Sequence, residues 1–257
     1  MIALVDGDIV CYRCAATAKE EDPFDVVAYR IDVLMRQILE AADCGEYVAY
    51  LSGADNFRKV INPDYKANRK DMVPPKFLQE AREFLVTEWK AKVTHYIEAD
   101  DALGIDQGDN TVVCSIDKDL LMIPGKHFNW LKQIYGDMTV QSQQDADMFF
   151  WKQMLIGDRS DNIIGVRGVG PVKADKYIVA EEDNQTWFNI VYDAYEYDAS
   201  RFVRNANCLW IKRSEESLWH KDLNLILPNE LQQEQEVLLE SMTFMTTDTS
   251  MQHTMSL

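Results

Sequence analysis

The sequence predicts an α/β fold, in which a parallel twisted sheet flanked by helices precedes a mostly helical C-terminal part. Short apolar runs at residues 2–5, 47–51 and 111–116 are typical of buried strands, and segments with helical spacing of apolar side chains separate them. Strands that alternate with helices favour a parallel, doubly wound sheet. From about residue 142 to residue 227 the pattern is mostly helical, which predicts a second part with a different architecture.

The elements of the first part follow from local patterns. After the first strand, residues 25–41 place apolar side chains at helical spacing. Residues 76–92 predict a second helix, which begins after a pair of prolines. Residues 98–105 predict a short third helix. The run at residues 111–116 is continuous rather than alternating, so we expect a strand that is buried on both faces.

The second half of the chain is divided by turn signals. Residues 128–132 and 138–141 flank a Gly-Asp pair and predict a hairpin. Residues 144–156 predict a helix, and closely spaced glycines interrupt the helical pattern after it. The polar, weakly periodic end of the chain predicts a helix that frays into a tail. The expected divisions are residues 1–142, 143–230 and 231–257.

Composition excludes several classes of protein. The 257 residues carry a net charge of −17, so a protein that binds nucleic acid over its whole surface is excluded. A hydrophobic content of 47% excludes a disordered chain. No apolar run approaches the roughly 20 residues of a membrane span, and the N-terminus lacks the basic segment of a secretory signal. The odd number of cysteines, five, favours a reduced compartment, and we expect a cytoplasmic location.

Acidic residues follow each of the three predicted strands. The carboxyl ends of parallel strands lie at one edge of a sheet, where ligands bind in open α/β folds. Further acids open the predicted helix at residue 98 and follow Gly157. The candidate metal ligands are Asp6, Asp55, Glu98, Asp100, Asp101, Asp117, Asp119, Asp158 and Asp161.

Carboxylates that converge repel one another unless a cation compensates them. Hard divalent ions prefer oxygen ligands, and Mg²⁺ binds a few carboxylates and keeps several waters. Two such ions about 3.5–4 Å apart suit the in-line displacement of a phosphoryl group. Each acidic pair taken singly also fits an ordinary turn or helix cap. The repetition at three strand ends favours a shared site, which we expect to bind two Mg²⁺ ions.

Basic residues are concentrated in two segments. Residues 58–76 contain six bases and two acids, and Lys66, Arg69 and Lys70 have the i, i+3, i+4 spacing of one helix face. Tyr65 offers a ring on which a base could stack, and Arg58 belongs to the same basic segment. A solvated helix face is the alternative interpretation of this segment.

Closely spaced glycines between two predicted helices form the most specific pattern in the chain, at residues 157–174. Backbone groups exposed around Gly168 and Gly170 could bind a phosphate or a monovalent cation. Lys173 and Lys176 would then lie beside the DNA backbone. A plain tight connection between two helices is the alternative.

These motifs, in this order, resemble the flap endonuclease / 5′→3′ exonuclease superfamily, in particular its phage branch. The resemblance covers roughly residues 1–180 and rests on the motifs that contain Asp6, residues 65–69, residues 98–101, residues 115–119 and the glycine block. It implies a PIN-like nuclease core at residues 1–142 with an arch at about 60–95. It also implies a helix–three-turn–helix at about 144–180 that grips duplex DNA with K⁺. Ile164 and Arg167 depart from the family pattern, and the arch segment is short.

The resemblance also implies roles for individual residues. Asp6, Asp55, Glu98 and Asp100 resemble the ligands of one ion. Asp117, Asp119 and Asp158 resemble those of a second, with Asp101 and Asp161 in support. Lys66 and Arg69 resemble the cations that hold the scissile phosphate, and with Asp6, Asp117 and Asp119 they make up the predicted catalytic set. Tyr65 resembles the ring that stacks on the terminal base.

The implied function is a structure-selective 5′ nuclease of phage DNA replication or degradation. We expect a monomer that acts on DNA with 5′ ends, flaps or nicks and on RNA in hybrids, without a membrane partner, with Mn²⁺ as a substitute for Mg²⁺. Three alternatives stay open. A haloacid-dehalogenase-type phosphatase would use Asp6 as a covalent nucleophile, but Ile9, Val10 and Cys11 follow where that fold needs Thr or Ser. A PIN-type ribonuclease and an inactive DNA-binding scaffold are the others.

Overall fold

The computed structural model describes residues 1–133 and 137–254, and side chains up to residue 242 outside that gap. The chain forms two compact units. The first contains residues 1–55, 72–146 and 211–217, and the second contains residues 56–71, 147–210 and 218–257. Both units are discontinuous in sequence, whereas the expected divisions were continuous. No described helix is long and apolar enough to cross a membrane.

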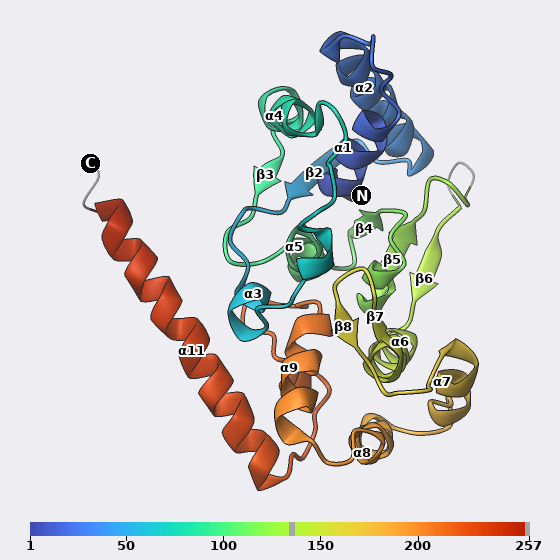
Figure 1. The fold of residues 1–257 in the computed structure, drawn as a ribbon. Coiled ribbons are helices and arrows are strands. Elements are labelled where there is room, and N and C mark those ends of the chain that lie inside the picture. Colours follow the sequence, from blue (N-terminus) through green and yellow to red (C-terminus); the bar gives the residue numbers. More distant parts are fainter. Residues whose placement is uncertain (134–136, 255–257) are drawn as a thin grey trace. The chain divides into compact units, whose positions relative to one another are not determined.

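A six-stranded sheet with the order β3-β2-β1-β4-β5-β6 organises the first unit (Figure 1). Neighbouring strands from β3 to β5 are parallel, and β6 is antiparallel to β5. The predicted α/β class with a mainly parallel sheet is therefore confirmed. The elements of this unit are β1 (Ile2–Asp6), α1 (Gly7–Ala16), α2 (Phe24–Ala41), β2 (Glu46–Leu51), α4 (Leu78–Trp89), β3 (Lys92–Val93), α5 (Ala99–Asp106), β4 (Thr111–Cys114), η2 (Asp119–Met122), β5 (Gly125–Phe128) and β6 (Thr139–Gln141).

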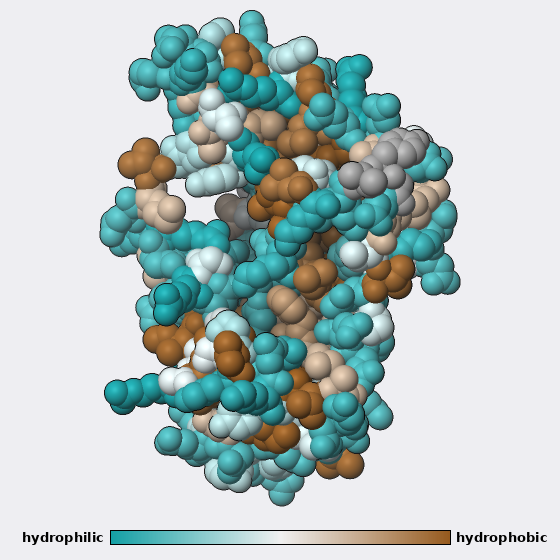
Figure 2. Space-filling model, turned by 90° about the vertical axis from the view of Figure 1, so that its right-hand side faces the viewer, coloured by the Kyte–Doolittle hydropathy of each residue, from teal (hydrophilic) through white to brown (hydrophobic). Residues whose placement is uncertain are grey.

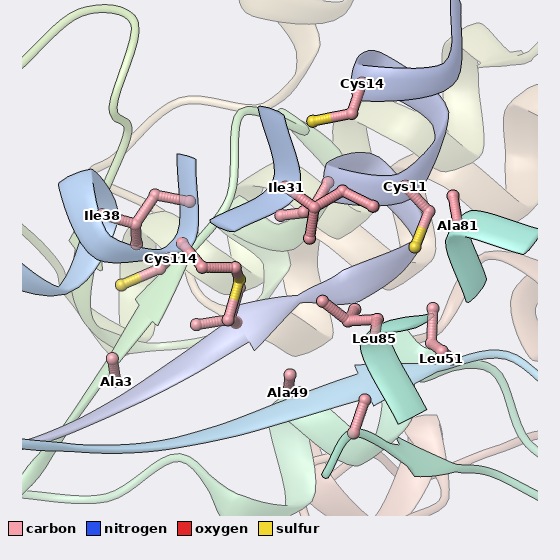
Figure 3. Packing of buried hydrophobic residues seen from close by; sticks show 14 of the residues in the cluster. Ala3, Cys11, Cys14, Ile31, Ile38, Ala49, Leu51, Ala81, Leu85 and Cys114 are labelled. Carbon is pink, nitrogen blue, oxygen red and sulfur yellow. The ribbon is translucent and has the colours of Figure 1, made fainter. Parts of the chain in front are cut away.

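Helices cover both faces of the three central strands. Successive side chains of a strand point to opposite faces, so each strand contributes apolar residues to both layers. Ala3 of β1 and Ala49 of β2 join the core cluster that α1, α2 and α4 complete with residues such as Ile31 and Leu85 (Figure 3). The intervening Leu4 is 1% exposed on the opposite face, where α5 contacts β1 and β2. Burial on both faces explains why these strands are continuously apolar in sequence.

The cysteines belong to this packing. All five are free and buried, and Figure 3 shows Cys11, Cys14 and Cys114 within the core. Burial raises the pKa of Cys11 to about 12, so its thiol stays protonated and unreactive at neutral pH. The Cys-x-x-Cys pair is therefore a packing feature of α1.

The second unit is mostly helical. The helix α6 begins in the first unit and continues into the second, where two two-residue strands, β7 and β8, pair antiparallel. Gly157 begins β7 with φ +76, and a Cβ there would lie 2.3 Å from the backbone nitrogen of Gly165, so glycine is required. The elements are α3 (Phe57–Ile61), η1 (Ala67–Arg69), α6 (Gln143–Ile156), β7 (Gly157–Asp158), β8 (Ile163–Ile164), α7 (Pro171–Tyr177), α8 (Asn184–Ala194), α9 (Ala199–Leu209), α10 (Trp219–Asp222) and α11 (Asn229–Thr254).

Three local expectations need correction. The basic residues from Lys66 to Lys70 do not form an α-helix, because Lys66 has φ 57 and only a 3₁₀ turn follows. The predicted hairpin consists of β5 and β6, and part of its turn lies outside the described residues. The start of the expected tail is packed, since Leu231 of α11 is 0% exposed and α11 contacts α9.

Candidate active site

Asp6 lies at the junction of β1 and α1, where it caps the helix. Its Oδ1 accepts a hydrogen bond from the Ile9 amide at 3.1 Å, and its Oδ2 accepts one from the Ser115 hydroxyl at 2.7 Å. The side chain is 2% exposed. Burial, with smaller contributions from the charges of Asp8 and Asp117, raises the pKa of Asp6 to about 7 despite these two hydrogen bonds. A cation at this position would favour the charged form.

Ser115 connects Asp6 to the acids that follow β4. Its Oγ accepts a hydrogen bond from the Asp117 amide at 3.0 Å, and Asp117 Oδ1 accepts one from the Asp119 amide at 2.9 Å. Lys118 forms an ion pair with Asp119 at 3.4 Å. Because β1 and β4 are neighbours in the sheet, Asp6 and Asp117 are brought to one edge, as the sequence predicts.

Ser52, directly after β2, continues this edge on the other side of β1. Its amide donates to Asp8 Oδ2 at 2.9 Å, and its hydroxyl accepts from the Ala99 amide at 2.9 Å. Arg82 of α4 donates to Asp8 and to the Ser52 carbonyl. The Arg82 cation compensates the charge of Asp8, so Asp8 is held as part of the structure.

The acids at the start of α5 form a capping box, in which Glu98 and Asp101 each accept from the other's backbone amide. Asp101 is 0% exposed, and its Oδ1 also accepts from the Lys212 amide at 3.1 Å. Asp101 therefore fixes the start of α5, and its support of a metal ion stays a prediction. Glu98 and Asp100 are half-buried beside it.

The residues at this edge fit a hard divalent cation by their chemistry. Carboxylates are among the oxygen ligands that Mg²⁺ and Mn²⁺ prefer. The pKa of Asp6 is raised mainly by burial and to a smaller extent by the charges of Asp8 and Asp117, so a bound cation would favour the charged form of this carboxyl. Among the described side chains, those of residues 1–133 and 137–242, no three from His, Cys, Asp or Glu are already arranged around a common ion position. In this unit the ligands for such an ion would be Asp6, Glu98, Asp100, Asp117 and Asp119.

Asp55 is exposed, and none of the hydrogen bonds of the acidic edge involves it. Its assignment as a ligand stays a prediction.

A groove of about 760 Å³ runs between the end of β2 and α4, lined by Ser52, Gly53 and Arg82 among others. Open space therefore adjoins the acidic edge, and a polymer strand could lie there.

The remaining acids are Asp158, which ends β7, and Asp161, which lies in the turn before β8. Asp158 is 9% exposed, and its Oδ1 accepts from the amide and the hydroxyl of Ser160, each at 2.7 Å. These bonds fix the shape of the turn that presents Asp161. The assignment of Asp158 to a second ion stays a prediction.

Lys66 and Arg69 both contact Asp161. The Arg69 guanidinium forms an ion pair with Asp161 Oδ1 at 2.8 Å, and Lys66 Nζ lies 3.7 Å from Oδ2. Lys66 Nζ also lies 5.0 Å from the centre of the Tyr65 ring. The two cations that the sequence singled out therefore lie side by side within the second unit.

Two of the predicted DNA contacts are wrong. Arg58 is 2% exposed, and its guanidinium donates to the carbonyls of Cys208 at 2.9 Å and Trp210 at 2.6 Å. Tyr65 is 4% exposed, so its ring has no free face for a base. Backbone carbonyls satisfy the buried Arg58 guanidinium, and Asp161 Oδ2 accepts from the Tyr65 hydroxyl at 2.7 Å. Lys70 is exposed, as a DNA contact requires.

Replacing Arg58 by methionine is expected to lower the free energy of unfolding by about 2–4 kcal/mol, because two buried carbonyls lose their donor. The salt dependence of DNA binding should not change, since Arg58 does not reach a phosphate. Urea denaturation and binding titrations at several salt concentrations measure both quantities. The comparison variant is Lys173→Ala. The slope of the logarithm of the DNA-binding constant against the logarithm of salt concentration should become smaller by about one in this variant. If Arg58→Met also reduced this salt dependence, Arg58 would contact a phosphate, and its assignment as a buried donor to two carbonyls would be wrong.

The glycine block lies between α6 and α7, as predicted. Gly168 has φ +75 and open space around it. Gly170 caps α7, with a proline at the first turn. Lys173 Nζ donates to the Gly168 carbonyl at 2.8 Å, and Lys176 is exposed on α7. The backbone and both lysines are therefore accessible, and the phosphate and K⁺ assignments stay predictions.

Sequence reasoning missed Ser52, Ser115 and Arg82. Both serines directly follow a buried strand, which is a signal that could have been used, since such positions point into the crevice at the sheet edge. Arg82 gave no local signal, because its partner Asp8 lies 74 residues away.

No protein-family model matches the chain, but individual proteins do. The chain is 26% identical over 226 residues to the 5′-3′ exonuclease of Buchnera aphidicola, a match that spans 80% of this chain and 77% of that protein. It is 25% identical over 205 residues to the flap endonuclease Xni of Shewanella putrefaciens, a match that spans 72% of this chain and 77% of that protein. It is 30% identical over 130 residues to the exonuclease of Escherichia phage T7, spanning 47% of this chain and 43% of that protein.

Two solved structures of phage T5 proteins have a fold similar to that of this chain. The T5 flap endonuclease, solved as a complex with DNA and metal ions, gives a TM-score of 0.61 at 16% identity and covers 94% of this chain and 99% of that chain. The T5 5′-exonuclease with bound zinc gives a TM-score of 0.62 at 17% identity, and the match covers 94% of this chain and 99% of that chain. At such identities the likeness shows the fold. Sequence relatives and fold agree, and the chain fits the flap endonuclease and 5′→3′ exonuclease superfamily, which confirms the resemblance drawn from its motifs.

Proposed function

We propose that the chain is a divalent-metal-dependent 5′ nuclease that hydrolyses DNA phosphodiesters from the 5′ end. The observation that carries the proposal is the acidic edge of the sheet, where Asp6, Ser115 and Asp117 are joined by hydrogen bonds. Its relatives are named as 5′-3′ exonucleases and flap endonucleases, and a neighbour of the same fold was solved with DNA and metal ions.

Each group has a chemical task in this proposal. Two divalent cations, when bound, supply Lewis acidity that makes water a nucleophile at neutral pH and neutralises charge on the phosphate. Asp6 at the end of β1, and Asp117 and Asp119 after the neighbouring strand β4, would supply carboxylate ligands for these ions. Lys66 and Arg69 stabilise the charge that develops on the phosphodiester. The released product carries a 3′-hydroxyl.

The finer parts of the proposal concern the ion, the substrate and the setting. Mg²⁺ is the natural ion and Mn²⁺ substitutes for it, because both accept hard oxygen ligands. K⁺ binds the backbone around Gly168 and Gly170. The protein acts as a monomer in the cytoplasm of a phage-infected cell, and RNA in RNA–DNA hybrids is also cut.

The test is a panel of 5′-labelled substrates with Mg²⁺: a 5′ flap, a nicked duplex, a blunt duplex and an RNA–DNA hybrid, with a small phosphate ester as a further arm. We expect cleavage of the DNA substrates and none of the ester. Asp117→Ala, purified in parallel, shows that any cleavage belongs to this chain. Hydrolysis of the ester alone would instead support the phosphatase alternative.

Metal binding should also stabilise the fold. A cation that binds only the folded chain stabilises it by about 2.7 kcal/mol at a hundred times its Kd, so Tm should rise with Mg²⁺ or Mn²⁺. Asp117→Ala should lose most of this rise. A Tm that is indifferent to both ions would contradict a metal site among these acids.

A further inference from the structure

The turn at residues 158–162 holds the basic motif, residues 64–69, by contacts that span the whole motif. Asp161 Oδ2 accepts from the Tyr65 hydroxyl at 2.7 Å, and the Lys66 amide donates to the Asp161 carbonyl at 2.9 Å. The Arg69 side chain donates to Asp161 Oδ1 at 2.8 Å and to the Ser160 carbonyl at 3.1 Å.

Two asparagines extend these contacts to both ends of the motif. Asn68 Nδ2 donates to the Arg159 carbonyl at 2.8 Å. From the turn, Asn162 Nδ2 donates to the Asp64 carbonyl at 2.8 Å. Asn162 has φ 59, a conformation that asparagine tolerates better than most residues.

The motif needs this support, because it has little regular structure of its own. Lys66 has φ 57, and the following 3₁₀ turn spans three residues. Long cationic side chains on such a segment would lose rotamer entropy when they bind a phosphate. A fixed counter-charge removes part of that loss before substrate arrives.

We infer that Asp161 is a positioning residue, which orients Lys66 and Arg69 for the substrate phosphodiester, with Asn68 and Asn162 fixing the backbone beneath them. The inference rests on the proposed nuclease function and deepens it. It differs from the role that the sequence assigned to Asp161, which was support of a metal ion. In the described structure its two carboxylate oxygens contact Tyr65, Lys66 and Arg69, all within the second unit.

Tyr65→Phe and Asn162→Gly test the inference without a change of charge. Tyr65→Phe keeps the buried ring and removes only the hydroxyl that bonds to Asp161. Asn162→Gly keeps the left-handed backbone and removes the bond to Asp64. The double variant is expected to lower kcat on a 5′-flap substrate about tenfold or more, because small misplacements of catalytic groups are costly. The half-saturating Mg²⁺ concentration should stay unchanged, since no predicted metal ligand of the acidic edge is altered.

The matched control is Asn224→Gly. Asn224 has φ 53, is exposed and lies in the same unit. It should retain the wild-type kcat. A double variant with the wild-type kcat would overturn the inference, and thermal unfolding of each variant shows whether it is folded.

Asp161→Asn separates positioning from metal binding. For a positioning residue, kcat falls at every metal concentration while the half-saturating Mg²⁺ concentration stays within about twofold. If the residue is a ligand, that concentration rises by about tenfold or more, and added Mn²⁺ or Mg²⁺ restores the rate, which would overturn the inference. A wild-type protein without activity on any DNA substrate would refute the proposed function itself, whereas normal variants of an active wild type refute only the positioning role.

Discussion

Replacing Asp6 by asparagine is expected to reduce cleavage of a 5′ flap by at least about a hundredfold, while the metal-free protein becomes more stable at pH 8. The loss follows from removing a proposed metal ligand, because even residues that only orient a ligand contribute 10–100-fold to metal affinity or activity. Asparagine retains an oxygen for the Ile9 amide and a polar group for Ser115, so the cap of α1 is preserved.

The gain in stability follows from the pKa of Asp6. The folded-state pKa is about 7, raised mainly by burial from the ordinary value of 3.8. As the pH rises through this window, the unfolded chain loses its proton before the folded chain does, so the folded state becomes progressively less favoured. The stabilising contribution of neutral Asp6 is complete below about pH 4 and is lost above about pH 7. Three pKa units correspond to at most about 4 kcal/mol.

Urea denaturation in EDTA at pH 5 and pH 8 measures this effect. Asp6→Asn should lack the fall in stability that the wild type shows between the two pH values. Asp109→Asn, an exposed acid in the same unit, should behave as the wild type does in both stability and cleavage. Identical pH dependence of wild type and Asp6→Asn would show that Asp6 is already ionised at low pH, contrary to its burial.

Replacing Lys66 by alanine is expected to lower kcat about 10²–10³-fold, the cost of removing one group that stabilises developing charge in a transition state. Arg69→Ala should have an effect of similar size, because both side chains contact the same carboxylate of Asp161. Their effects should not be additive, since residues that share a partner act as a unit.

Single-turnover cleavage at saturating enzyme isolates kcat from DNA affinity in these variants. Lys221→Ala, an exposed lysine of the second unit, controls for the general loss of one positive charge and should cleave at the wild-type rate. If Lys66→Ala weakens only DNA binding and leaves the single-turnover rate intact, the lysine is an electrostatic contact and has no part in the chemical step.

Local sequence predicted those features that depend on local chemistry. A buried strand that ends in Asp6, and another that ends in Ser115 and Asp117, identified the acidic edge because parallel strands end on the same side of a sheet. The glycines around Gly165 identified the tight connection between α6 and α7, because only glycine fits where two backbones approach so closely.

The two wrong DNA contacts, Arg58 and Tyr65, are errors about burial. Arg58 and Lys66 look alike in a charge count, yet one is buried against carbonyls 150 and 152 residues away and the other is an ion-pair partner of Asp161. A positive charge predicts a DNA contact only if the side chain reaches solvent. The sequence of residues 56–71 does not determine which of its side chains are exposed.

Periodicity and the chemistry of neighbouring residues were enough to predict the α/β class, the acids at the strand ends and the basic and glycine motifs. Which of these residues contact one another depends on the packing of the folded chain. The Ser115 hydroxyl lies 109 residues from Asp6, and Tyr65 lies 96 residues from Asp161. Such partners are chosen by the packing of whole strands and helices, whose burial free energy is shared among many residues and leaves no signal at the two that finally touch.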